Sequence, residues 1–259
     1  MKISRALAFI AAASVAITLV GTAAASHSWG RYHWERASNL TLDLGDNVSD
    51  TWDPFLVEAS SDWSASAVLD TEVVGGGTTG SICSPTSGQI EVCSAAYGQT
   101  GWLGLAQIWV TRGSHITQAV TKVNDTYFNA APYNTPAWRS LVMCQEIGHD
   151  FGLDHQDENF SNPNLGSCMD YTNDPGGNEH PNQHDYEQLV TIYSHADGGS
   201  KGKGKPNGQG NGNSDPPGLT ELAGNAPPFS QASRANGVRY VDDLGNGQHL
   251  ITFIFWTLD

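Results

Sequence analysis

The chain has 259 residues and carries 12 Lys and Arg against 27 Asp and Glu, a formal net charge of −15 at pH 7. An acidic surface repels phosphate groups, so nucleic acid and anionic lipid are excluded as expected partners. The stretch with globular character runs from His27 to about His195, which is long enough for one hydrophobic core.

The first residues predict a cleavable secretory signal. Lys2 and Arg5 precede an apolar run over residues 6–20, and small residues lead up to cleavage after Ala25. The alternative is an uncleaved membrane anchor, but the run is shorter than the about 20 residues that a membrane span needs. We therefore expect residues 1–25 to be removed, and the mature protein to be secreted, extracellular and free of the membrane.

The elements that follow begin with a strand and a helix. Residues 39–44 alternate apolar and polar side chains, as a half-buried strand does. Between Trp52 and Trp63 the apolar residues recur on one helical face, and Pro54 fits the first turn of that helix. Residues 67–74 are predicted as another strand.

A loop is predicted over residues 75–101, where Gly, Ser and Thr are frequent. Residues 105–110 and 116–123 are rich in β-branched and apolar side chains, and they are predicted as two strands joined by a turn at residues 112–114.

A second helix is predicted to begin at Thr135, a capping residue followed by Pro136, and to end near Gly152. The order of strand, helix, several strands and helix predicts an α+β fold, with helices packed on a mixed twisted sheet.

The four cysteines predict two disulfides, because an even number in an exported chain favours oxidation over zinc–thiolate binding. Four cysteines allow three connectivities. Of these we favour Cys83–Cys93, which closes the predicted loop, and Cys144–Cys168.

The composition changes after the globular stretch. Residues 197–225, rich in Gly, Lys, Asn and Pro, are predicted as a flexible linker. In the C-terminal segment, residues 226–259, two apolar runs at 238–244 and 250–258 flank a Gly-Asn-Gly turn, which predicts a β-hairpin. The second run is too apolar to stand alone in water, so we expect it to dock on the main domain, with a polymer or cell wall as the alternative surface.

One segment combines a helix end with potential metal ligands. Gln145 and His149 lie one helical turn apart on the same face, so both can reach one ion. Gly152 lets the chain turn, which returns His155 towards that ion. Glu146 lies beside this face, where it could take a proton from a metal-bound water.

These residues read QExxHxxGxxH and resemble the HExxHxxGxxH signature of the metzincin zinc peptidases. Met169, within the sequence Ser-Cys-Met-Asp-Tyr, resembles the Met-turn that lies beneath the metal in that clan. The residues after Gly152 and the segment from Asp185 to Tyr193 are similar to matrixins in particular. The resemblance covers residues 34–195 and assigns residues 26–196 to a metzincin-like peptidase domain.

The resemblance implies a secreted zinc-dependent endopeptidase with Zn²⁺ as cofactor, His149 and His155 as metal ligands, and Glu146 as general base. Met169 would form an apolar floor under the metal. Tyr171 has the spacing of a tyrosine that stabilises the reaction intermediate in astacins and serralysins, and packing is the alternative role. Protein or peptide would be the substrate.

Gln145 departs from the signature, since an amide oxygen is a weaker zinc donor than imidazole. It could still bind through its carbonyl oxygen, which we favour. Otherwise His180, His184 or Tyr171 could replace it, or the metal could be lost. In the last case the chain is a catalytically impaired, secreted binding protein on a metzincin-like scaffold.

Two further metal sites are considered from the sequence. Carboxylates are numerous enough for Ca²⁺, but no spacing identifies a site. The cluster Trp29, Tyr32, His33 and Trp34 is interpreted as packing at the chain end rather than as a second metal site.

Overall fold

The computed structural model describes residues 27–28, 31–36, 40–111, 114–197 and 239–258. The predicted signal sequence, Trp29, the centre of the turn at 112–114 and all but the first residue of the predicted linker lie outside the described residues.

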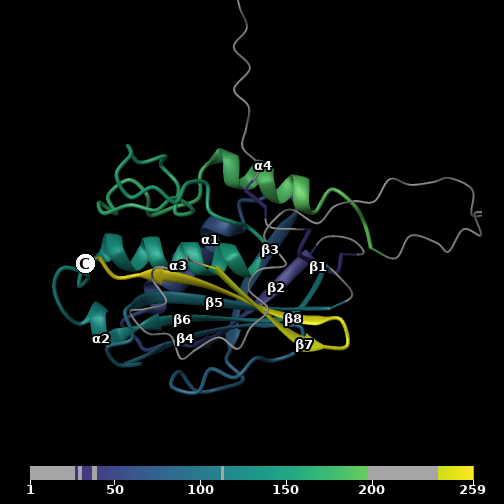
Figure 1. The fold of residues 1–259 in the computed structure, drawn as a ribbon, viewed down its shortest axis with the longest axis horizontal. Helices are drawn as coiled ribbons and strands as arrows, with labels where there is room; N and C mark the ends of the chain where they lie inside the picture. Colours follow the sequence, from purple (N-terminus) through teal and green to yellow (C-terminus); the bar gives the residue numbers. More distant parts are fainter. Residues whose placement is uncertain (1–26, 29–30, 37–39, 112–113, 198–238, 259) are drawn as a thin grey trace, which may run out of the picture.

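The described residues form an α+β fold around one mixed sheet (Figure 1). Its strands are β1 (His33–Trp34), β2 (Leu40–Asn47), β3 (Leu69–Gly75), β4 (Ile90–Ala95), β5 (Trp102–Thr111), β6 (His115–Asn124), β7 (Arg239–Gly245) and β8 (Gln248–Trp256). The order is β3-β2-β4-β6-β5-β8-β7, and β1 pairs separately with β6. The pairs among β1, β2, β3, β4 and β6 are parallel, and β5, β8 and β7 continue the sheet in antiparallel fashion. The predicted fold class is confirmed.

The helices are α1 (Asp53–Trp63), α2 (Asp125–Phe128), α3 (Pro136–Asp150) and α4 (Gln183–Ile192). As Figure 1 shows, α1 and α3 lie on one face of the sheet and α4 lies beyond α3. The start of α3 is as predicted: the Thr135 hydroxyl accepts a hydrogen bond from Trp138 N, and Pro136 occupies the first turn. Nearly all of α3 is buried, so it carries the core between the sheet and the other helices.

The prediction of an uninterrupted loop over residues 75–101 is wrong, because β4 lies within it. This strand is inserted in parallel between β2 and β6, with Ile90 and Val92 fully buried. Gly, Ser and Pro residues on both sides of this short apolar run favoured the prediction of a loop. The run forms a strand because β2 and β6 pair with it on both sides. The short β1 and α2 were also not predicted. Both favoured disulfides, Cys83–Cys93 and Cys144–Cys168, are confirmed.

The C-terminal hairpin is present and docks on the main sheet, as expected from its apolar second strand. Strand β8 pairs with β5 along its whole length, from Trp102 opposite Trp256 to Thr111 opposite Gln248. On the helix side, Phe253 and Phe255 join the main core.

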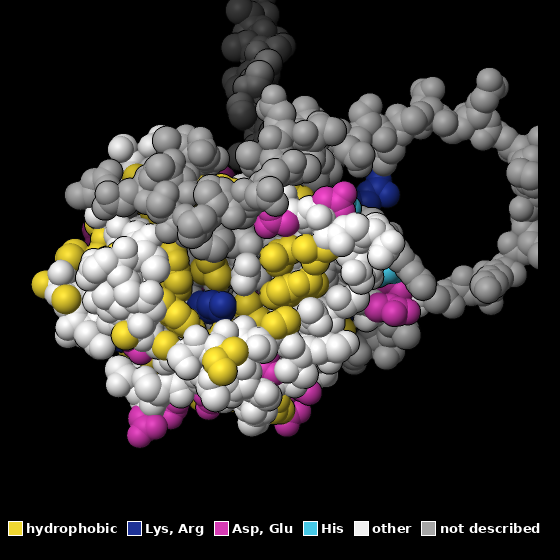
Figure 2. Space-filling view, turned by 60° about the horizontal axis from the view of Figure 1, so that its bottom comes forward, with side chains coloured by type: hydrophobic (Ala, Val, Ile, Leu, Met, Phe, Trp, Pro, Cys, Tyr) yellow, Lys and Arg dark blue, Asp and Glu magenta, His cyan; other side chains and the backbone are white. Residues whose placement is uncertain are grey.

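The opposite face of the sheet is also apolar. Figure 2 turns that side forward and shows hydrophobic side chains gathered on it, beside a basic one. A second hydrophobic cluster joins β5, β7 and β8 there, comprising Trp102, Leu105, Tyr240, Ile254 and Trp256. Alternate residues of β8 therefore pack into two different hydrophobic clusters, one on each face of the sheet. A shift of one residue would exchange the two sets of side chains, so this packing fixes the register of the hairpin. No helix in the described part of the chain has the length and apolar character to cross a membrane.

Gly148 is the point of closest approach between α3 and its neighbours. A Cβ at this position would lie 2.6 Å from Met169 Sδ and 2.7 Å from Trp63 Cζ2. Both neighbours are fully buried and cannot withdraw easily. The absence of a side chain at Gly148 therefore sets the spacing between α1, α3 and the turn at Met169.

We predict that Gly148→Ala lowers the free energy of unfolding by about 1–3 kcal/mol, because overpacking outweighs the gain in helix propensity. Gly75→Ala is the control, since nothing lies within 4 Å of its added Cβ, and it should stay within about 0.5 kcal/mol of wild type. Urea unfolding measures both, and equal stability of the two variants would contradict this packing.

Candidate metal centre

The end of α3 brings the predicted residues together. Gln145, Glu146 and His149 are buried on this helix, and the chain reverses directly after it. Gly152 has φ +94°, and a Cβ there would lie 2.1 Å from Tyr32 O. Both the left-handed backbone and the close approach require glycine. The reversal returns His155 to the helix.

The two histidines face each other through their Nε2 atoms, which are 2.9 Å apart. The Nδ1 of His149 lies 2.9 Å from Leu153 O, to which only an N–H can donate. In the neutral ring, this leaves Nε2 with a lone pair directed at His155. Zn–N bonds of 2.0–2.1 Å in a tetrahedron place two ligand atoms about 3.3 Å apart. The imidazole pair is therefore close to the spacing that one shared ion requires.

Burial favours the neutral form of His149. Removal from water lowers the pKa of His149 well below its ordinary value, and the neighbouring His155 adds to this effect. Neutral imidazole is the form that binds metal. On its other side, His155 Nδ1 lies 3.5 Å from Glu158 Oε1, so an outer carboxylate is at hand to orient the ring.

Glu146 places a carboxylate against β5. A Cβ at Gly104 would lie 2.6 Å from Glu146 Oε1, so this glycine makes room for it. Neither oxygen has a hydrogen-bond partner of normal geometry among the described residues. Burial raises the pKa of Glu146 well above its ordinary value, Asp150 adds to the rise, and the backbone of Ala106 opposes it. Such a carboxyl is suited to holding a proton in a dry site.

Gln145 presents a free oxygen within the same buried region. Its Nε2 donates to Cys168 O at 2.7 Å, which fixes the orientation of the amide. Its Oε1 has no hydrogen-bond partner among the described residues. An unpartnered buried oxygen is costly unless a cation or water satisfies it. This observation fits a metal ligand at Gln145.

The two histidines proposed as replacements for Gln145 are engaged elsewhere. His180 is exposed and its Nδ1 lies 2.7 Å from Asp62, while His184 stacks on His27. The structure therefore does not bring either one into the pair formed by His149 and His155.

Met169 packs against Gly148, the neighbour of His149 in sequence, and Tyr171 lies beside His155. Met169 is fully buried against Gly148, as an apolar floor would be. The ring of Tyr171 lies 4.4 Å from that of His155. Its hydroxyl donates to Ile254 O at 2.9 Å, and burial raises its pKa well above the ordinary value. Tyr171 thus offers a neutral O–H to a backbone carbonyl beside the histidines.

Strand β8 covers this centre, which sequence reasoning missed. The ring of Phe253 stacks on that of His149 at 4.1 Å and 5°. Under this cover His149 is 1% and Glu146 0% exposed. The apolar run of β8 predicted docking, but nothing in the sequence specified the face on which it docks.

Comparison with known proteins adds a limited likeness. No protein-family model matches the chain, and no curated protein does. Two solved structures of myroilysin are each 14% identical, with TM-scores of 0.34 and 0.36; they match 63% and 62% of this chain and 86% and 82% of theirs. A structure of high choriolytic enzyme 1, a hatching enzyme zinc-protease from the medaka fish Oryzias latipes, is 11% identical over 62% of this chain and 94% of that one, with a TM-score of 0.36. Values this low establish no family.

Proposed function

We propose that this chain is a secreted zinc-dependent endopeptidase of metzincin type, with the matrixins as its nearest resemblance. The observation that carries the proposal is the convergence of the Nε2 atoms of His149 and His155, together with the buried, unpartnered carboxylate of Glu146 on the same helix as His149. Ligands of this kind together with a free acid/base group are typical of a catalytic zinc site rather than a structural one.

His149 and His155 would hold the ion, with Gln145 Oε1 as the third protein ligand. Zinc in such a site supplies Lewis acidity and a water of lowered pKa. Glu146 takes the proton from the attacking water and delivers it to the leaving amine. Its raised pKa stabilises the state in which it holds that proton. Tyr171 is placed to donate to a peptide carbonyl oxygen, as it donates to that of Ile254.

We propose the domain organisation inferred from the sequence for the same protein. Residues 1–25 act as the signal, 26–196 form the peptidase unit, 197–225 form the linker and 226–259 form the hairpin segment. Two disulfides fit an oxidising extracellular compartment. The apolar side chains that suggested contact with a polymer are buried on β5.

The second candidate is a metzincin-like binding protein without catalysis. The substitution at Gln145 and the cover of β8 over the centre are the observations that favour it. The two candidates differ in whether Glu146 matters to turnover.

We predict that Glu146→Gln lowers kcat for hydrolysis of casein or gelatin by about 10²- to 10⁴-fold, because the amide cannot accept the proton. Zinc content should stay at the wild-type level, since Glu146 is not a ligand. Glu72→Gln, at an exposed position of β3, is the control. Undiminished hydrolysis by Glu146→Gln would reject the mechanism, and no chelator-sensitive hydrolysis by any form would favour the binding protein.

We predict that Gln145→Ala weakens zinc binding by at least about tenfold, the loss that even an outer-shell partner can cause. Gln145→His should bind zinc more tightly than wild type, because imidazole is the better donor. Competition titration with a zinc chelator measures both variants. Equal affinity of wild type and Gln145→Ala would remove Gln145 from the ligand set.

A further inference from the structure

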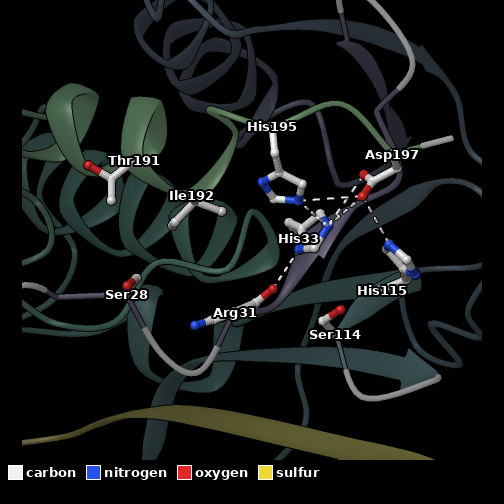
Figure 3. Close-up of a pocket in the computed structure, with 9 residues that line it drawn as sticks. All are labelled: Ser28, Arg31, His33, Ser114, His115, Thr191, Ile192, His195 and Asp197. Atoms are coloured by element: carbon white, nitrogen blue, oxygen red, sulfur yellow. Dashed lines mark hydrogen bonds and ion pairs between the residues drawn. The ribbon is translucent and has the colours of Figure 1, made fainter. Parts of the chain in front are cut away.

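A second histidine cluster lies away from the centre just described. His33 from β1, His115 from the start of β6, and His195 and Asp197 from the segment after α4 point into one pocket (Figure 3). His33 and His115 are register partners in the β1–β6 pair. The four residues come from three separate parts of the chain and meet through the fold.

His33, His115 and Asp197 each place one ligand atom within 4.8 Å of the others, and His195 lies beside two of them. The Nε2 atoms of His115 and His195 lie 3.3 and 3.4 Å from Asp197 Oδ1. That of His33 lies 3.4 Å from Asp197 Oδ1 and 3.1 Å from His195 Nε2. Bonds of 2.0–2.1 Å in a tetrahedron give ligand separations of about 3.3 Å. These four contacts have the length of the edges of a zinc tetrahedron.

The rings of this cluster face the carboxylate of Asp197 through their Nε2 atoms. His33 Nδ1 is directed at Arg31 O, to which only an N–H can donate. Its Nε2 is then a lone pair in the neutral ring, yet it faces both the carboxylate of Asp197 and the Nε2 of His195. When the ring is doubly protonated, its Nε2 donates to Asp197 instead, so either a proton or a metal ion can hold this cluster together. A backbone carbonyl on the other ring nitrogen is also the usual partner of a metal-bound histidine.

Asp197 is held as an anion and is oriented from behind. The backbone N–H of Arg36 donates to its Oδ2 at 2.9 Å, and Asp197 N donates to Arg36 O. Burial opposes ionisation, but this N–H and the hydrogen bonds with His115 and His33 lower the pKa of Asp197 to about 2. The side chain of His195 is 49% exposed, so the pocket is open to an ion from solvent.

We propose that His33, His115, His195 and Asp197 form a second zinc site. Three imidazoles and a carboxylate are a donor set that favours Zn²⁺ over Ca²⁺ or Mg²⁺. Four protein ligands fill a tetrahedron, so the site is structural. It would clamp β1, near the start of the described chain, to the segment that leaves α4. The sequence interpretation of the cluster around His33 as simple packing would then be wrong.

The test compares zinc content in the full chain, prepared without a histidine tag. His115→Asn with His195→Asn should bind one zinc ion fewer per chain than wild type. The matched control is His180→Asn with His249→Asn, two histidines outside the cluster, which should keep the wild-type content. Mass spectrometry of metals measures the stoichiometry, and Co²⁺ substitution should give tetrahedral visible bands that weaken only in the cluster variant.

Equal zinc content in wild type and the cluster variant would overturn the second site and leave a histidine–carboxylate ion-pair cluster. Should the double variant fail to fold, His195→Asn alone keeps the test decisive. Its side chain is half exposed, and it should weaken the second zinc-binding step at least about tenfold. Because the difference is taken against wild type, the result does not depend on zinc at the first centre.

A separate observation concerns β8, and the inference from it rests on the proposed function. Strand β5 would be the edge of the sheet without the hairpin, and β8 fills that edge in antiparallel pairing beside the histidine pair. An exposed edge binds extended peptides by adding a strand. The Tyr171 hydroxyl donates to the backbone carbonyl of Ile254, and Phe253 lies on His149. A backbone carbonyl and a side chain of β8 thus occupy the places that a bound peptide would take.

We infer that β8 is an inhibitory strand that lies in the substrate position and must leave β5 before a substrate can bind. The predicted linker before it would let the hairpin leave without breaking the chain. Phe253→Ala removes the ring on His149 and should raise the rate of peptide hydrolysis about tenfold or more, since a shift of 1.4 kcal/mol in the docking equilibrium changes the open population tenfold.

A reversible lock gives the sharper test. Gln107 and Thr252 are partners across β5 and β8, so replacing both by Cys should tie the strand down. Asp242 and Leu250 are partners within the hairpin, and the same replacement there is the matched control. Only the first lock should abolish hydrolysis and protect His149 from diethylpyrocarbonate, and mild reduction should reverse both effects.

The chemical modification of His149 distinguishes the inhibitory role of β8 from the proposed peptidase activity. Faster modification in Phe253→Ala with no hydrolysis by any form would refute the peptidase and retain the cover. Hydrolysis and modification rates unaffected by the lock would refute the inhibitory strand and leave the peptidase standing.

Discussion

The chain reversal at Gly152 is the constraint on which the first centre depends. A left-handed residue ends α3 and turns the backbone so closely beneath Tyr32 O that no side chain fits. The same turn places Leu153 O against His149 Nδ1, which selects the tautomer, and brings His155 opposite its Nε2. The facing arrangement of the two histidines and the tautomer of His149 therefore both depend on this one backbone turn. Gly148, one residue before His149, allows Met169 to support the helix end from below.

Burial gives this centre its chemical character. Glu146 and Asp150 are fully buried carboxyls one turn apart on α3, and burial is the main cause of the raised pKa of each. Asp150 receives a hydrogen bond from the Thr121 hydroxyl at 2.7 Å, whereas Glu146 lacks a comparable partner. Asp150 is therefore held in place by a side-chain hydrogen bond that Glu146 lacks. The hairpin strand strengthens the burial, and it also closes a sheet edge that would otherwise attract other chains.

The two histidine clusters follow the same physical rule and differ in completeness. In both, a backbone carbonyl binds Nδ1 of one ring and leaves its Nε2 to face other donors. At the end of α3, the proposed set of two imidazoles and an amide oxygen would leave a coordination position open. In the pocket around Asp197, four side chains complete the set without an adjacent free acid. A zinc site with a free coordination position is suited to catalysis, and a zinc site with four protein ligands is suited to stabilising the fold.

The sequence by itself determined the features that depend on local spacing. The 3.6-residue period and the Thr-Pro start predicted α3, the Gly-Asn-Gly turn predicted the hairpin, and the spacing of His149 and His155 predicted that these two would meet. Each rests on contacts within about a dozen residues, where chain geometry leaves few alternatives.

Only the tertiary structure decided the rest. Strand β4 exists because β2 and β6 pair with it on both sides, and its own residues specify it weakly. The position of β8 over His149 depends on an apolar strand finding the open edge of β5, and many apolar surfaces could have received it. His33, His115 and Asp197 come from three separate parts of the chain, so no local pattern could link them. Their meeting follows from strand pairing and from the path of the chain after α4, which are set by the packing of the whole core.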